Sequence, residues 1–154
     1  MKISRRQMGL LLPALAATAT ASAQTTGAPA PAPGVERLPV MKTRAYRFAE
    51  LPVITNGKNK RRSMFTDKTH TGFKISSHMN EVAPGEVNHP PHQHLREEMM
   101  LIREGTIELT VNGKPYRLGP GDVDVIGSNE MHNAKNVGTA PAHYFIVNIG
   151  SDDL

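Results

Sequence analysis

His92, His94 and Glu98 carry side chains that bind metal ions, and their spacing would let them do so together. The stretch 89–94 reads HPPHQH, so that three of the seven histidines lie within six positions. On a β-strand, side chains repeat every second residue, which would direct His92, His94 and Glu98 to one face. Two imidazoles and a carboxylate on one interior surface satisfy each other best through a borderline divalent cation. A polar lip of a β-barrel would also explain an isolated His-x-His pair.

The composition restricts which ligands such a site could use. The chain has no cysteine, which excludes thiolate ligands, thiol nucleophiles and disulfides. Any metal site must therefore be built from histidine and carboxylate. His70, His78 and His143 have no spacing that ties them to the cluster. His89 is expected to be an exposed loop residue, with a supporting hydrogen-bond donor or an alternative ligand as the other interpretations.

Short strands would have to position these side chains. From about Met41 onward no long segment has a helical period, whereas short runs are separated by Gly, Pro and Asn. Asn112-Gly113 is typical of a two-residue hairpin turn. The chain shows no internal repeat, so we expect one sandwich or barrel. The first predicted strand begins at Phe73 and ends near Pro84. Further strands are predicted at 97–103, 107–111, 116–118, 123–126 and 142–149.

Two groups of residues resemble the two sequence motifs of the cupin family. The first group is Gly85, His92, His94, Glu98 and Gly105. The second is Gly113, the turn Pro120-Gly121-Asp122, His132 and Asn136. The resemblance covers residues 72–149. It implies an all-β fold with a single cupin barrel, which is a double-stranded β-helix or jelly roll.

The resemblance also implies a set of metal ligands. In cupins the residues that match His92, His94, Glu98 and His132 bind one divalent transition metal ion, here Mn, Fe, Ni, Cu or Zn. Glu98 could in addition act as a catalytic base by loosening from the metal. Asn136 could face the cavity or hold a local turn. A cupin that keeps the four ligand positions without binding metal is the alternative.

The N-terminal segment is expected to be an export signal. Residues 1–23 combine a basic start, a short apolar stretch and the cleavage signature Ala21-Ser22-Ala23. The sequence SRRQM at 4–8 resembles a twin-arginine motif, with an ordinary Sec signal as the alternative. Either signal predicts a periplasmic or secreted protein without a membrane span in its mature form. Residues 24–38 are then a Pro- and Ala-rich linker, and residues 39–154 form the cupin domain.

The charge balance argues against nucleic-acid binding. Removal of Lys2, Arg5 and Arg6 with the signal reduces the 18 basic residues to 15, against 14 acidic ones. The chain has no tryptophan and few other aromatic residues with which bases could stack. The remaining basic cluster lies at 58–62, beside Asn56-Gly57. It is expected to be a solvated loop, with an anion or substrate clamp as the alternative.

The expected function is that of a metal-dependent enzyme acting on a small organic molecule, either dioxygenase-like or isomerase-like. A non-catalytic module that binds a small molecule or stores metal is the alternative. On the strand after Glu98, parity places Met100 and Ile102 inside and Met99 and Leu101 outside. An outward apolar row of this kind resembles the dimer surfaces common in cupins, so we expect a homodimer.

Overall fold

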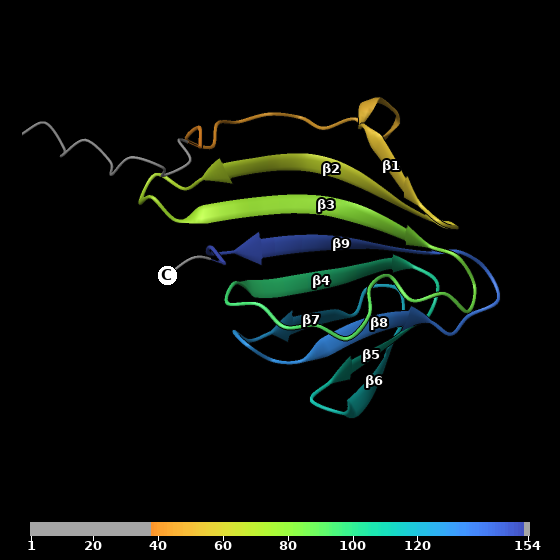
Figure 1. The fold of residues 1–154 in the computed structure, drawn as a ribbon. Helices are drawn as coiled ribbons and strands as arrows, with labels where there is room; N and C mark the ends of the chain where they lie inside the picture. The colour runs from red at the N-terminus through yellow and green to blue at the C-terminus, as the bar shows by residue number, and fades with distance from the viewer. Residues whose placement is uncertain (1–37, 153–154) are drawn as a thin grey trace, which may run out of the picture. The chain divides into compact units, whose positions relative to one another are not determined.

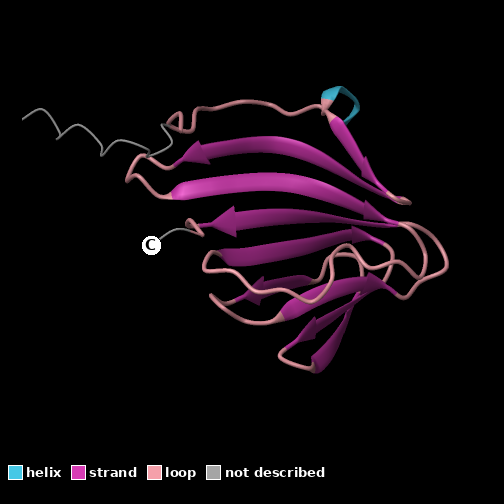
Figure 2. Cartoon of the chain, in the orientation of Figure 1, coloured by secondary structure: helices cyan, strands magenta, loops and turns pink. Residues whose placement is uncertain are grey.

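The computed structural model describes residues 38–152. The predicted export signal at 1–23 and the linker up to residue 37 lie outside the described residues, and export stays a prediction from the sequence. Strands dominate the described part, with one short 3-10 helix (Figure 2). No helix in this part is long and apolar enough to cross a membrane. The elements are η1 (Phe48–Glu50), β1 (Val53–Asn56), β2 (Asn59–Lys68), β3 (Lys74–Val82), β4 (Glu97–Glu104), β5 (Ile107–Val111), β6 (Lys114–Leu118), β7 (Val123–Ile126), β8 (His132–Asn136) and β9 (Ala142–Ile149).

The strands form two antiparallel sheets (Figure 1). The larger has the order β1-β2-β3-β9-β4-β7, and the smaller has the order β6-β5-β8. Strands that are neighbours in a sheet are in several cases far apart in the sequence, such as β3 and β9. The all-β class predicted from the sequence is therefore confirmed.

Glycine and asparagine turns set the register of the hairpins. Asn112 and Gly113 join β5 to β6 with φ angles of 48° and 80°. Positive φ at both central residues gives the turn that matches the twist of a hairpin, as the sequence predicted. Gly105 connects β4 to β5, and a Cβ at this position would lie 2.6 Å from Ala142 Cα. A side chain at Gly105 would therefore push β9 away from the connection.

Both sheets contribute to the core. Met100 and Ile102 are each 1% exposed, whereas Met99 and Leu101 are 37% and 40% exposed. The predicted parity of β4 is therefore confirmed, and the homodimer inferred from its outer row stays a prediction. The buried apolar cluster consists of Val82, Met100, Ile102, Ile107, Leu109, Ile126, Ala142, Tyr144 and Ile146.

The basic segment at 58–62 is not the loop that the sequence suggested. Residues from Asn59 onward belong to β2, which pairs with β1 through a tight turn at Gly57 (φ 58°). Charged side chains at successive positions hide the apolar alternation by which a strand is recognised. Because successive side chains of a strand leave on opposite faces, Lys60 and Arg62 lie on one face and Arg61 on the other.

Candidate metal centre

The backbone brings His92 and His132 together although they are far apart in the sequence. The two residues exchange hydrogen bonds, from His92 N to His132 O (3.0 Å) and from His132 N to His92 O (2.8 Å). Such a pair lies directly opposite in an antiparallel ladder, so both side chains leave on the same face. The segment before β4 thus runs along β8 at the open edge of the smaller sheet (Figure 1). This segment pairs with β8 only through isolated bridges. His92 and His94 therefore do not lie on the regular strand that the sequence suggested.

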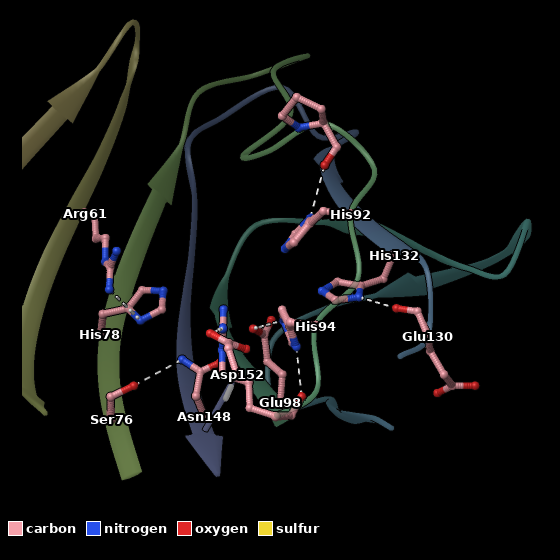
Figure 3. A network of polar contacts seen from close by, with 12 residues as sticks. Arg61, Ser76, His78, His92, His94, Glu98, Glu130, His132, Asn148 and Asp152 are labelled. Carbon is pink, nitrogen blue, oxygen red and sulfur yellow. Dashed lines mark hydrogen bonds and ion pairs between the residues drawn. The ribbon is translucent and has the colours of Figure 1, made fainter. Parts of the chain in front are cut away.

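A backbone carbonyl fixes the orientation of each of the three imidazole rings (Figure 3). Each ring uses Nδ1, which contacts a carbonyl oxygen two residues away: His92 to Pro90 (3.1 Å), His94 to Arg96 (2.8 Å) and His132 to Glu130 (2.7 Å). A carbonyl oxygen can only accept, so each Nδ1 must carry the proton. In a neutral ring, Nε2 is then the unprotonated nitrogen with a free lone pair.

Ring nitrogens of the three histidines lie close together. One ring nitrogen from each of His92, His94 and His132 lies within 4.8 Å of one from each of the other two. Nε2 of His94 and Nε2 of His132 are buried and have no hydrogen-bond partner among the described residues. Buried polar atoms without partners are costly, and a shared cation would satisfy them together. The cluster is therefore consistent with a metal site typical of cupins.

Glu98 lies at the border of this cluster. Its Oε2 is 3.6 Å from His94 Nε2, and its side chain is 14% exposed. Burial raises the pKa of the Glu98 carboxyl, and the nearby His94, Arg96 and His92 oppose that rise. The close cluster thus contains three of the four predicted ligands, and Glu98 directs a carboxylate oxygen toward it from the start of β4 (Figure 3).

A cavity of about 620 Å³ opens onto the cluster. Residues of both sheets line it, so it lies between them. His92, Glu98 and His132 belong to the lining, as do the apolar side chains of Met100, Leu109 and Ile146. The metal cluster would therefore face a space large enough for a small organic molecule.

Two further polar residues line this cavity: His78, which the sequence did not tie to the cluster, and Arg61 of the basic segment, for which an anion or substrate clamp was the alternative. His78 is 8% exposed, and its Nδ1 lies 3.5 Å from Arg61 Nη2. Burial first, and then the positive charge of Arg61, lowers the pKa of His78 to about 3. His78 is therefore neutral at physiological pH. Only the register between β2 and β3 brings it to the cavity, and no local spacing signals that position.

The depressed pKa of His78 predicts a loss of stability in acid. The unfolded chain binds a proton at His78 below about pH 6.5, whereas the folded protein does so only near its pKa of about 3. The linkage relation then lowers the unfolding free energy by about 2 kcal/mol between about pH 7 and about pH 5. In His78→Gln this part of the loss should vanish. Urea unfolding of both metal-free proteins at the two pH values tests the prediction, and equal losses would contradict it.

Asp124 is a second buried acid near the site. Neither carboxylate oxygen has a hydrogen-bond partner among the described residues. Burial, and to a lesser extent the charge of Glu98, raises the pKa of Asp124 to about 7. Asp124 faces inward from β7 opposite Met100, but it does not line the cavity. No motif marked this residue in the sequence.

Asn136, the last residue of the second motif, has a structural role. It is fully buried, and its Nδ2 donates to the backbone carbonyls of Val82 and Ala140, each at 2.8 Å. Its Oδ1 accepts from the N–H of Gly138 at 2.9 Å. The amide therefore holds the connection between β8 and β9, which is the second of the two interpretations that the sequence left open.

Comparisons with known proteins agree with this geometry. The family described as Cupin domain matches residues 78–148. A search of curated protein sequences found no match. Among solved structures, an RmlC-like cupin from Shewanella frigidimarina is similar with a TM-score of 0.61 and 13% identity, over 73% of this chain and 95% of that chain.

Two further solved structures show the same likeness. A sugar phosphate isomerase from Silicibacter pomeroyi has a TM-score of 0.57 and 14% identity, over 70% of this chain and 76% of that chain. A predicted oxalate decarboxylase from Thermotoga maritima has a TM-score of 0.59 and 20% identity, over 70% of this chain and 100% of that chain. At these identities the likeness shows the fold alone. Residues 78–148 therefore match the model of the cupin family, and the chain has the cupin fold that its two motifs predicted.

Proposed function

We propose that this cupin is a metal-dependent enzyme that acts on a small organic molecule in the cavity between its sheets. His92, His94, Glu98 and His132 would hold one divalent transition metal ion. The observation that carries the proposal is the convergence of three imidazoles whose Nδ1 atoms are all engaged by backbone carbonyls. The protein fixes ring orientation and tautomer in advance, which is how metal-binding histidines are commonly supported.

The residues present suit a hard-to-borderline cation and a ligand with an oxygen donor. When bound, such a metal polarises an oxygen atom of an enol, phenol or carboxylate substrate. Glu98 reaches the same space, and its carboxylate could take up a proton from a bound molecule. The apolar side chains of Met100, Leu109 and Ile146 would exclude water from one wall. Histidine binds metal only when neutral, so metal affinity should fall as the pH drops through the imidazole range.

The similar structures named above are described as an isomerase and a predicted decarboxylase, which shows that one fold hosts different reactions. A dioxygenase-like or isomerase-like reaction is compatible with a metal beside one carboxylate.

One observation favours a non-catalytic binding module as the second candidate. The two acidic residues that line the cavity are Glu98 and Asp152, and Asp152 is bound to Arg96. Asp124 does not line the cavity. Among the described residues, Glu98 is then the one cavity carboxylate without an arginine partner, so no second free carboxylate lines the cavity to share in proton transfer.

Metal analysis combined with a substrate panel tests the proposal. The protein is purified from its export compartment, its metal is identified by mass spectrometry, and oxygen uptake and product masses are followed with enols and catechols. We expect about one metal ion per chain and conversion of at least one compound. Bound metal with saturable binding but no conversion would support the binding module instead. Protein that takes up no transition metal would contradict the metal-dependent enzyme.

A further inference from the structure

The basic segment at 58–62 contains one residue that differs from its neighbours. Three of its four basic side chains pair with acids: Lys58 with Glu86 (2.9 Å), Lys60 with Glu81 (2.7 Å) and Arg62 with Glu81 (3.6 Å). Arg61 has no carboxylate partner among the described residues. Its one polar side-chain contact there is to His78. These pairs account for the other three cations, whereas Arg61 requires a separate explanation.

The register of the large sheet turns Arg61 toward the cavity. Arg61 lies opposite Asn80, and Ser63 lies opposite His78, so Arg61 and His78 are diagonal neighbours on one face. Both line the cavity that opens onto the three histidines. In Figure 3, Arg61 and His78 lie on the left, and His92, His94 and His132 lie on the right. Arg61 is also exposed to solvent, so an incoming molecule can reach it.

Arg61 and His78 together present hydrogen-bond donors and no acceptor. Arginine has donors only, so in their contact Arg61 donates and Nδ1 of the neutral His78 ring accepts. Nε2 of His78 then carries the ring proton and is a donor as well. A guanidinium beside a further N–H donor is suited to a carboxylate, which accepts at both of its oxygens.

The charge of Arg61 is incompletely compensated. Loss of surrounding water lowers the pKa of Arg61, and the charge of Arg96 lowers it further, while Glu98 opposes this. The cavity's other arginine, Arg96, is already engaged, because it donates to Asn148 Oδ1 (3.0 Å) and pairs with Asp152. Arg61 is thus the cavity arginine left to receive an anion from outside.

We propose that Arg61 and His78 form a subsite for a carboxylate, so that the ligands of this cavity are small organic acids. The other end of such an acid would lie at the three-histidine cluster. This second half rests on the proposed function, whereas carboxylate binding by Arg61 and His78 does not require the metal.

Binding of matched dicarboxylates tests the subsite. Succinate, glutarate and adipate, each paired with its monomethyl ester, are titrated calorimetrically into full-length zinc-loaded protein and into metal-free protein. Arg61→Gln removes the charge and keeps most of the side chain. Arg62→Gln is the matched control, because Arg62 is the next residue of the same strand but pairs with Glu81 and stacks on Phe48. Zinc content is measured in every sample.

At least one diacid should bind zinc-loaded wild-type protein, and Arg61→Gln should weaken that binding by about 10-fold or more. Arg62→Gln should change it by less than about twofold, and zinc content should stay equal in all three proteins. Equal binding by Arg61→Gln, or binding of none of the diacids by the wild type, would overturn the subsite and leave the metal centre standing. Absence of zinc from the wild type would instead contradict the proposed function, and binding to metal-free protein would still decide the role of Arg61.

Discussion

His94→Ala should remove nearly all bound metal from the purified protein. His94 supplies a ring nitrogen to the close cluster, and its Nε2 is buried without a hydrogen-bond partner among the described residues. Loss of a residue that merely supports a metal ligand costs about 10- to 100-fold in affinity, so loss of the ligand itself should cost more than about 100-fold. The metal-free fold should persist, because the substitution removes a buried nitrogen that lacks a hydrogen bond together with the single contact of Nδ1 to the Arg96 carbonyl.

Metal content and thermal unfolding together measure the effect. Added metal should raise the melting temperature of the wild type, because a ligand that binds only the folded state stabilises it, and should leave His94→Ala unchanged. His89→Ala is the matched control. His89 lies beside His92 with ring centroids 5.5 Å apart, yet it is not part of the close cluster. Wild-type metal occupancy in His94→Ala, or loss of metal in His89→Ala, would show that the ligands are assigned wrongly.

Much of the fold could be predicted because its signals are local. The turn at Asn112-Gly113 and the alternation on β4 follow from backbone conformation and from burial of every second residue. β7 and β9 have the predicted bounds, 123–126 and 142–149. β2 was missed because its charged residues conceal which face is buried. The strands that flank β2 in the sheet determine which of its faces is buried, and a local pattern within β2 does not show this.

The site was only partly predictable for the same reason. His92, His94 and Glu98 lie close together in the sequence, and their spacing alone points to a common ligand. His132 entered through the family resemblance, and its place beside His92 follows from a pair of backbone hydrogen bonds between distant segments. The basic cluster at 58–62 suggested an anion clamp as an alternative, but only strand register decides that Arg61 is the member that faces the cavity.

Glu98→Gln should nearly abolish turnover of any substrate that the wild type converts, even when metal is supplied to saturation. The change keeps the shape of the side chain and removes the negative charge that lies 3.6 Å from His94 Nε2. Metal affinity should fall because a carboxylate ligand becomes a neutral amide. If Glu98 also moves a proton, the saturated rate should fall by a further factor of about 100 to 10,000. Titrating metal until its content no longer rises, and then measuring the rate, separates the two effects.

Glu97→Gln is the matched control for this experiment. Glu97 is the adjacent residue of β4, it is exposed, and alternation places it on the opposite face from Glu98. The same chemical change there should leave metal affinity and rate within about twofold of the wild type, as is usual for surface positions. A Glu98→Gln protein that turns over at the wild-type rate once saturated with metal would confine Glu98 to metal binding. Proton transfer would then have to come from another group that lines the cavity, such as His78 or His89.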